Sequence, residues 1–302
     1  MCVDEIDIAL SRSLMRNSRT SYSDLGKELG LSPQVVHRRV QALIEAGIVR
    51  GTYTTLSFKA LGAMWVVVHG WSKARSMDEM DSRFRRIPQV AMSQVASGNY
   101  VYVHASVRDA VDLAHLVTAV QQEAQMSEPQ VGIVPLPPSP PVTLTRMDLR
   151  IIKALAEDTR RPMTDIAEEL GTTVKTARRR LERLIAEDLV QLSIHWQPDS
   201  LGDTISQIHL TLKDDVPREK AAFLLIKKYA TGVVRSYAFS NQPNQVILTY
   251  WSRNVRDMQN ACREMEAEGV FTSVVPNIIR DIYYYDEHRN APLEEMLKHV
   301  KR

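Results

Sequence analysis

The chain contains one long internal repeat. When the sequence is shifted by 141 residues, the separation of Asp7 and Asp148, the segment from Asp7 to Val49 aligns with the later copy without a gap. Identical positions include Leu14 and Leu155, Arg19 and Arg160, Asp24 and Asp165, Glu28-Leu29-Gly30 and Glu169-Leu170-Gly171, Arg38-Arg39 and Arg179-Arg180, and Leu43-Ile44 and Leu184-Ile185. The period is far longer than the roughly 20–50 residues of a solenoid unit. It therefore indicates a duplicated pair of domains.

The composition is that of an ordinary globular chain. Of 302 residues, 44% are apolar and 25% are charged, and the formal net charge is +2. The longest apolar run, Ala63–Val68, is far shorter than the roughly 18 residues of a membrane span, and the first residues lack the regions of a secretory signal. Two cysteines are present, Cys2 and Cys262, and no Cys/His cluster has zinc spacing. We expect a cytoplasmic protein with no membrane partner, no metal and no cofactor.

The first copy begins with two predicted helices. Over residues 4–16, apolar residues recur at the spacing of an amphipathic helix. Ser23 is the expected N-cap of a short helix over 24–29. Gly30 ends that helix, because a tight turn between helices often needs a positive φ.

A third helix is predicted after this turn. Ser32 is the expected N-cap and Pro33 takes the first helical position, where a missing N–H is tolerated. The helix is expected to run to about Ala46 and to be followed by a strand over 48–55. Its expected inner residues are Val36, Val40, Leu43 and Ile44. Its expected outer residues are Gln34, Val35, His37, Arg38 and Gln41.

The second copy repeats this plan with more positive charge. Thr164 is the expected cap of a helix over 165–170, Gly171 makes the turn, and Thr173 caps a helix ending near Ala186. The expected inner residues are Ala177, Leu181, Leu184 and Ile185. The expected outer residues are Lys175, Thr176, Arg178, Arg179 and Glu182. Arg180 and Arg183 add to the charge of this helix, so we expect it to neutralise more DNA phosphate than the first.

A short helix, a tight turn and a second capped helix form the helix-turn-helix pattern, whose second helix enters the major groove of DNA. A basic helix face is more often merely solvated, and such modules also serve as structural or protein-binding units, but two copies in register favour binding to double-stranded DNA. The candidate DNA contacts are Ser32, Gln34, Val35, His37, Arg38 and Arg39 in the first copy and Thr173, Lys175, Thr176, Arg178, Arg179 and Arg183 in the second. Since arginine pairs with guanine and glutamine with adenine, Gln34 against Lys175 and His37 against Arg178 are the differences expected to change base preference.

Each module is followed by a region with the predicted order βαββαβ, the split-βαβ plan of ferredoxin-like domains. In the first copy the expected strands are 63–71, 90–96, 100–107 and 130–136, with helices at 76–87 and after Asp109. In the second copy the expected strands are 204–212, 233–239, 246–251 and 270–285, with helices at 218–229, 255–268 and 292–300. The predicted fold class is α+β, with two copies of a winged helix-turn-helix joined to a ferredoxin-like domain.

These elements define five expected segments. A proline-rich run over 135–141 separates the copies and is expected to be a semi-rigid linker, with a ligand for a partner domain as the alternative. The boundaries are 1–55 for the first helix-turn-helix, 56–136 for the first ferredoxin-like domain, 137–143 for the linker, 144–196 for the second helix-turn-helix, and 197–302 for the second ferredoxin-like domain with its C-terminal helix.

The chain resembles the leucine-responsive regulatory protein/AsnC family of transcriptional regulators, in a tandem-duplicated form. The first copy carries the resemblance in Asp7-Ile8, Leu14, Leu25–Pro33, Val36–Val40, Leu43 and Gly47-Ile48-Val49. The second copy carries it in Met147-Asp148, Ile166–Gly171, Ala177–Leu181 and Leu189. With the βαββαβ order, the resemblance covers nearly the whole chain.

The resemblance implies homo-oligomers built through the sheet domains, and an amino acid or other small-molecule effector bound between sheet domains near a glycine-containing segment. In this chain that segment is Ser97-Gly98-Asn99-Tyr100, which is shorter than the usual form. In the second copy Asn241-Gln242-Pro243-Asn244 has no glycine. Both segments therefore depart from the family's pattern.

Two other functions stay open. Tetrapyrrole (siroheme) decarboxylases resemble the same family, and His69, His104 and His209 on predicted strands keep that function in view, although histidines on strands are more often structural. An architectural or assembly protein with degenerate DNA readers is the second alternative. Because the sequence contains no GxGxxG, P-loop, GxSxG or HExxH motif, we expect a regulator and not an enzyme.

Overall fold

The structure, a computed structural model, describes residues 3–136, 142–197, 202–286 and 289–299. The chain forms two compact units, and each takes segments from both sequence repeats. The first unit, which holds the strand-rich regions, consists of Met1–Arg12, Met64–Pro135 and Gln197–Tyr284. The second unit, which holds most of the helix-turn-helix modules, consists of Ser13–Ala63, Leu136–Trp196 and Tyr285–Arg302. Most of the expected linker, 137–141, lies outside the described residues.

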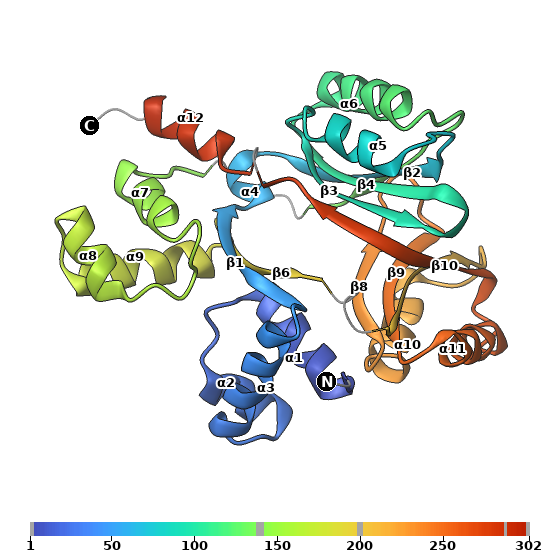
Figure 1. Ribbon diagram of the computed structural model, residues 1–302, viewed down its shortest axis with the longest axis horizontal. Helices are drawn as coiled ribbons and strands as arrows, with labels where there is room; N and C mark the ends of the chain where they lie inside the picture. The colour runs from blue at the N-terminus through green and yellow to red at the C-terminus, as the bar shows by residue number, and fades with distance from the viewer. Residues whose placement is uncertain (1–2, 137–141, 198–201, 287–288, 300–302) are drawn as a thin grey trace. The chain divides into compact units, whose positions relative to one another are not determined.

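The first module has four helices, the last of them short, and a wing strand (Figure 1). Its elements are α1 (Glu5–Arg16), α2 (Tyr22–Leu29), α3 (Pro33–Glu45), β1 (Val49–Leu56) and the short α4 (Phe58–Leu61). Gly30 ends α2 with a φ of 68°, and the Ser32 hydroxyl caps α3, both as predicted. The predicted cap Ser23 is wrong, because α2 starts earlier and the Ser21 hydroxyl accepts the Asp24 N–H at 3.1 Å.

The second module has the same order of elements. Its three helices and wing strand are α7 (Arg146–Ala154), α8 (Met163–Leu170), α9 (Val174–Ala186) and β6 (Val190–Trp196). A further helix from the end of the chain, α12 (Ala291–His299), packs its buried Leu293 with Leu149 and Ile152 of α7. Gly171 makes the turn with a φ of 64°, and the Thr173 hydroxyl caps α9. The predicted cap Thr164 is wrong. Pro162, with a φ of −59°, occupies the N-cap position of α8 without a side-chain cap bond, so Thr164 lies inside the first turn.

The inner faces of the two recognition helices, α3 and α9, differ from the prediction at one equivalent position. Three predicted residues in each helix are buried, namely Val36, Val40 and Leu43 in α3 and Ala177, Leu181 and Leu184 in α9. Ile44 and Ile185 are not, since they are 45% and 36% exposed. Each follows the last buried residue by one position, which is about 100° around a helix of 3.6 residues per turn. They therefore fall at the margin of the buried stripe.

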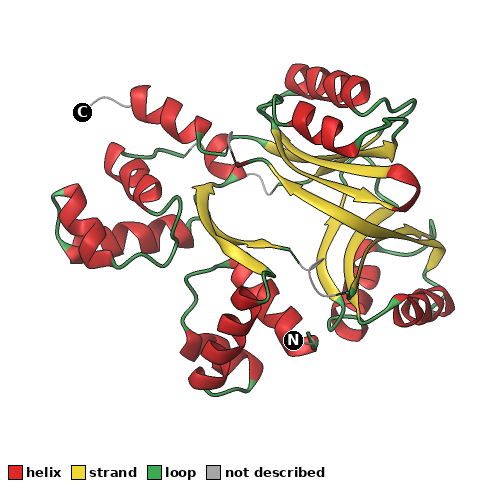
Figure 2. Ribbon diagram, viewed as in Figure 1, coloured by secondary structure: helices red, strands yellow, loops and turns green. Residues whose placement is uncertain are grey.

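The wing strands of the two modules pair with each other in a two-stranded antiparallel sheet (Figure 2). In its centre Thr52 pairs with Ile194 and Tyr53 pairs with Ser193. Under the repeat alignment, Thr52 corresponds to Ser193 and Tyr53 to Ile194. Thr52 therefore pairs with the repeat equivalent of Tyr53, and Tyr53 pairs with the repeat equivalent of Thr52. This reciprocal pairing indicates a two-fold axis through the centre of the sheet.

The first unit is built on one eight-stranded sheet. The first copy supplies β2 (Met64–Trp71), α5 (Met77–Phe84), β3 (Val90–Ala96), the 3-10 turn η1 (Ser97–Asn99), β4 (Tyr100–Val107), α6 (Ala110–Glu123) and β5 (Gln130–Val134). The second copy supplies β7 (Thr204–Leu212), α10 (Arg218–Lys228), β8 (Val233–Ala238), β9 (Gln245–Ser252), α11 (Val255–Ala267) and β10 (Phe271–Tyr284). The strand order β5-β2-β4-β3-β10-β7-β9-β8 contains two ferredoxin-like half-sheets joined where β3 meets β10.

The sheet folds over so that its two halves face each other. The Tyr102 hydroxyl on β4 lies 2.7 Å from Nε2 of His209 on β7, although β3 and β10 separate these strands in the sheet. Gln207 likewise donates to Gln94 across the two copies at 2.7 Å. The helices of each copy lie on the outer sides, over apolar cores (Figure 2). The inner face is consequently polar and aromatic.

The free edges of the folded sheet come together at β5. The Ser240 N–H, just beyond β8, donates to the Ile133 carbonyl at 2.8 Å. The fully buried Phe239 ring lies directly over Gly132, where a Cβ would stand 2.3 Å from a ring carbon. Only glycine allows this approach of β5 to the second half-sheet. Among the described helices, none is long and apolar enough to cross a membrane.

Candidate nucleic-acid interface

The start of each recognition helix is fixed by a capping hydroxyl. Ser32 accepts the Val35 N–H at 3.3 Å, and Thr173 accepts the Thr176 N–H at 3.2 Å. Such caps satisfy one of the free N–H groups of the first turn and hold the residues that follow in helical geometry. The candidate DNA contacts of each module are therefore presented from a defined first turn and the turn after it.

α3 presents a polar face of modest charge. Gln34, His37 and Arg38 are exposed. Val35, expected on this outer face, is half-buried, as is Arg39. An exposed glutamine, imidazole and guanidinium offer both hydrogen-bond donors and acceptors to base edges.

α9 presents a more basic face. Lys175, Arg178 and Arg179 are exposed. Thr176 is half-buried, and its hydroxyl lies 2.9 Å from the Thr173 hydroxyl. Three exposed cations on two turns of helix are suited to phosphate neutralisation and to guanine recognition.

Arg183, a candidate DNA contact, is bound to a buried carboxylate. Asp148 on α7 is fully buried, and its carboxylate forms ion pairs with Arg183 at 2.7 Å and with Arg180 at 3.0 Å. Burial acts to raise the pKa of Asp148, but hydrogen bonds from Thr145 and Arg180 and the charge of Arg183 hold that pKa below its ordinary value. The two arginines therefore hold α9 against α7, whereas Arg178 and Arg179 beside them are exposed.

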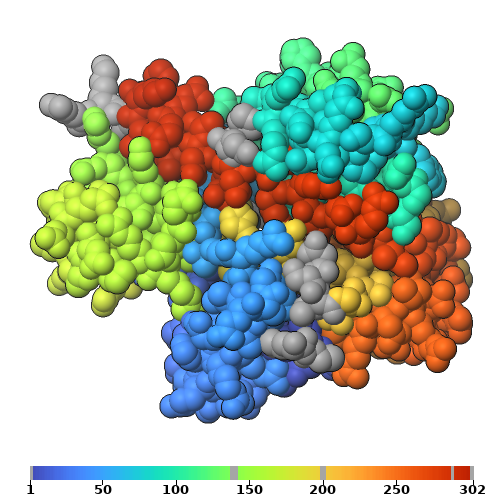
Figure 3. Space-filling view, in the orientation of Figure 1, coloured from blue at the N-terminus to red at the C-terminus, as the bar shows by residue number. Residues whose placement is uncertain are grey.

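The two modules contact each other about the same axis as the wing strands. The hydroxyls of Ser18 and Thr159, which are equivalent in the repeat, share a buried 2.8 Å hydrogen bond. Arg19 donates to the carbonyls of Thr159 and, at 3.0 Å, Arg161, and Arg160 donates to the Thr20 carbonyl at 3.1 Å. Figure 3 shows the two modules, blue and yellow-green, adjoining each other. The two recognition helices thus belong to one unit.

One contact between the modules has no counterpart in the other direction. The Arg160 guanidinium stacks 4.7 Å from the centre of the Tyr22 ring, whose edge meets the His37 ring at 5.4 Å. In the alignment Tyr22 corresponds to Met163, which has no ring. The second module therefore supports the first recognition helix through an aromatic side chain that only the first copy has.

The candidate effector residues form the turn between β3 and β4. Gly98 and Asn99 have positive φ values of 67° and 58°. The Ser97 hydroxyl donates to the Ile278 carbonyl of the second copy at 3.4 Å. Tyr100 is buried, and its hydroxyl lies 2.7 Å from Nδ1 of His69. The segment thus lies where the two half-sheets join.

Sequence reasoning missed the cluster of rings that surrounds Tyr100. His69, Tyr100, Tyr102 and His209 pack with ring centres 5.1–5.9 Å apart. Asn277 donates to the Tyr102 hydroxyl at 2.7 Å. Alternating histidines and tyrosines on strand-like segments were the available signal, but the sequence does not show that two half-sheets would bring them together.

Burial keeps these imidazoles neutral. It lowers the pKa of His69 and His104 to about 3 and that of His209 to about 4, and it raises the pKa of Tyr100 to about 12. Nε2 of His69 and both ring nitrogens of His104 have no hydrogen-bond partner among the described residues. The inner face therefore contains polar atoms whose hydrogen bonding is incomplete.

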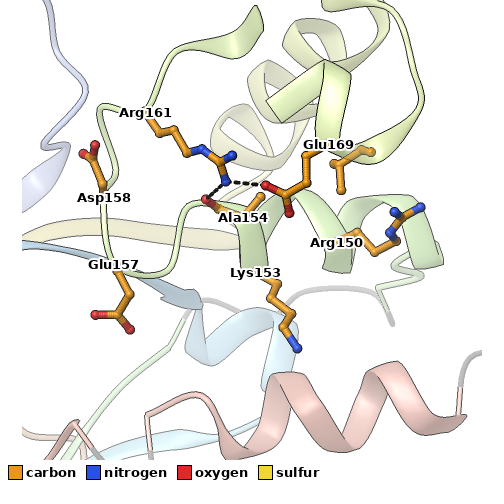
Figure 4. Close-up of a pocket in the computed structure, with 8 residues that line it drawn as sticks. Arg150, Lys153, Ala154, Glu157, Asp158, Arg161 and Glu169 are labelled. Atoms are coloured by element: carbon orange, nitrogen blue, oxygen red, sulfur yellow. Dashed lines mark hydrogen bonds and ion pairs between the residues drawn. The ribbon is translucent and has the colours of Figure 1, made fainter. Parts of the chain in front are cut away.

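A depression of about 540 Å³ lies on the second module between α7, α8 and the loop that joins them (Figure 4). Its rim carries cations and anions together. Arg161 binds Glu169 at 2.5 Å and the Ala154 carbonyl, and Lys153 reaches Glu294 of α12 at 2.7 Å. These ion pairs join α7, α8 and α12, so the depression fits a structural junction.

Family models match both modules. Residues 3–50 match a winged helix-turn-helix DNA-binding model, and residues 144–185 match the AsnC-type helix-turn-helix domain. The HTH-type transcriptional regulator Ptr1 of Methanocaldococcus jannaschii is 30% identical over 99 residues, which are 32% of this chain and 67% of that protein. The regulatory protein AsnC of Escherichia coli is 26% identical over 136 residues, 44% of this chain and 90% of that protein.

Solved structures of another protein match nearly the whole chain. The crystal structure of the siroheme decarboxylase NirDL covers 99% of this chain and 100% of its own, with a TM-score of 0.57 and 14% identity. At this identity the likeness shows the shared fold alone. It shows that a tandem arrangement of this kind exists in another single chain.

The paired modules and the folded double sheet define a tandem winged helix-turn-helix protein with ferredoxin-like domains. The chain belongs to the leucine-responsive regulatory protein/AsnC family, as the matches to its helix-turn-helix model and to its regulators show.

Proposed function

We propose that this protein is a sequence-specific, DNA-binding transcriptional regulator. The observation that carries the proposal is the pair of capped recognition helices with exposed polar and basic faces, held in one unit by the wing sheet. Its regulator relatives in the same family support it. DNA is the natural partner of such a pair, because helix-turn-helix dimers read two half-sites about one helical turn apart.

The two recognition helices contribute differently to DNA binding. Lys175, Arg178 and Arg179 neutralise phosphates and donate to guanines, so α9 supplies most of the salt-dependent affinity. Gln34 and His37 of α3 add hydrogen bonds that depend on the base. Ser32 and Thr173 position both helices, and Val35, Thr176 and Arg39 shape the contact surface.

The test is a fluorescence-anisotropy titration at two salt concentrations, comparing DNA upstream of the protein's own gene with scrambled DNA of equal length. Specific binding that survives higher salt is expected. The variant Arg178→Ala/Arg179→Ala should bind weakly and flatten the dependence of affinity on salt by about two released counterions. Its matched control is Arg253→Ala/Arg256→Ala, which removes two exposed arginines of the sheet unit. Unchanged affinity and slope in the first variant would remove α9 from the interface.

The sheet unit serves regulation in this proposal. An amino acid or another small molecule would bind at Ser97–Tyr100, where the two half-sheets join, and further copies would assemble through the sheet domains in the cytoplasm. The proximity of Ser97 to Ile278 supports a site that responds to the packing of the half-sheets. A thermal-shift screen of the common amino acids on the wild-type protein and on Asn99→Ala tests it. A stabilising amino acid whose effect is unchanged in the variant would place the effector elsewhere.

Tetrapyrrole decarboxylation is a second candidate function. The neutral imidazoles of His69 and His209 on the inner face, with one unpartnered ring nitrogen in His69, are the observation in its favour. Addition of an iron tetrapyrrole with absorbance monitoring separates the two functions. A saturable shift of the main absorption band that is lost in His69→Phe would support the enzyme. No shift, together with specific DNA binding, would support the regulator.

A further inference from the structure

We infer that one chain reads a complete, asymmetric operator: one half-site rich in A·T and one rich in G·C, about one helical turn apart and bound in a single orientation. The inference rests on the proposed function, because it requires DNA binding. It goes further in naming the number of chains and the kind of sequence that they bind.

The first support is that the two recognition helices already form a pair within one chain. The wing strands pair about a two-fold axis between Thr52 and Tyr53, and the hydroxyls of Ser18 and Thr159 meet on the same axis in a buried hydrogen bond. Helix-turn-helix proteins commonly obtain this symmetry by joining two identical chains, and their operators mirror it. Here no second chain is needed to place two recognition helices about an axis.

The second support is the chemistry of the exposed positions. Arg38 and Arg179 occupy equivalent positions, so each half-site is contacted by one arginine at the same place on its recognition helix. Two exposed polar positions differ, since Gln34 corresponds to Lys175 and His37 to Arg178. The half-buried Gln41 corresponds to the exposed Glu182. Glutamine forms two hydrogen bonds with adenine, whereas lysine and arginine pair with guanine and glutamate accepts from cytosine. The first half-site is therefore A·T-rich and the second G·C-rich.

The third support is the one-way contact between the modules. Arg160 reaches Tyr22, and Tyr22 meets His37, so the second module helps to position a reading residue of the first. Arg19 is the repeat equivalent of Arg160, but it stacks on no aromatic ring among the described residues and instead donates to backbone carbonyls. The pair is symmetric in backbone and unlike in reading surface. A palindrome would leave one recognition helix facing the wrong bases.

The experiment is a selection of duplexes from a random library by the full-length protein, followed by titration of the enriched duplex at stoichiometric concentration. We expect two unlike half-sites about 10 base pairs apart, one chain per duplex, and binding about tenfold or more tighter than to either palindrome made from one half-site. The variant Gln34→Lys/His37→Arg makes the first recognition helix resemble the second and should shift the preference to the G·C-rich palindrome. Gln259→Lys/Asn260→Arg, which adds the same charge at exposed positions of α11, should leave the preference unchanged.

Two results would overturn the inference while leaving the proposed function standing. One is enrichment of a palindrome by the wild-type protein. The other is two chains on each duplex, with one half-site per chain. A selection that enriches no sequence would instead remove the proposed function, and the inference would fail with it.

Discussion

Asp148 and Arg180 join the first helix of the second module to its recognition helix, with Oδ1 of the aspartate 3.0 Å from the guanidinium. Arg183 binds the other carboxylate oxygen at 2.7 Å. Asp148 also accepts the Thr145 N–H at 2.9 Å and so closes the capping box of α7. One buried carboxylate therefore sets both the start of α7 and the rotation of α9.

Replacing Asp148 with asparagine should lower the free energy of unfolding by about 2–3 kcal/mol, because two arginines lose a charged partner that is buried. Chemical denaturation measures this. The matched substitution Asp165→Asn, at an exposed position of α8, should cost less than about 0.5 kcal/mol. Equal effects of the two substitutions would show that the ion pairs of Asp148 add no measurable free energy of unfolding.

The hydrogen bond between Ser18 and Thr159 should show strong coupling. Thr159→Val leaves the Ser18 hydroxyl buried without this partner and should cost about 1–2 kcal/mol. The double variant Ser18→Ala/Thr159→Val removes both hydroxyls and should cost less than the sum of the two single changes. Denaturant titration of all four proteins gives the coupling, and simple additivity would contradict the proposed contact between the modules.

Stability should fall as the pH is lowered from about 6.5 toward 4. In the folded chain the pKa values of His69, His104 and His209 lie at about 3, 3 and 4, below the ordinary value of 6.5. In this range the unfolded chain binds protons that the folded chain does not, which costs up to about 1.4 kcal/mol per pH unit for each histidine. Denaturation measured at several pH values tests the slope.

His104→Phe isolates one part of that pH dependence. The ring lies between Trp65 and Tyr237, with centre distances of 5.7 and 5.3 Å, and loses no hydrogen bond to the described residues. The variant should be more stable than wild type at pH 5, and its stability should depend less steeply on pH. An unchanged slope would mean that His104 takes up its proton in the folded protein as readily as in the unfolded chain.

Gly132→Ala should disturb the closure of the folded sheet. A Cβ at this position would overlap the buried Phe239 ring, so a cost of about 1–3 kcal/mol is expected. Phe239→Leu shortens the opposing side chain and should cost less in the alanine background than in the wild type. Denaturation of the four proteins measures this, and independent effects would show that the ring moves aside freely.

The helices of the two modules could be predicted because their signals are local. Ser32, Pro33, Gly30, Thr173 and Gly171 act within one turn of their own position through capping, a fixed φ or a positive φ. The order of strands and helices along each half-sheet, βαββαβ, could likewise be predicted from apolar runs and turn residues. The errors at Ser23, Thr164, Ile44 and Ile185 are displacements of one or two residues, since several neighbouring residues offered similar local signals.

The sequence by itself determined the repeat, the type of each element and the residues that α3 and α9 carry at their starts. The tertiary structure decided which copies pair. It paired the wing strands β1 and β6 and joined the two half-sheets where β3 meets β10. It also brought His69, Tyr102 and His209 together on the inner face of the sheet. It also fixed Arg183 to Asp148 while Arg178 and Arg179 stayed exposed. The physical reason is that these contacts join residues far apart in the chain, and periodicity records which face of an element is apolar but not which partner covers it.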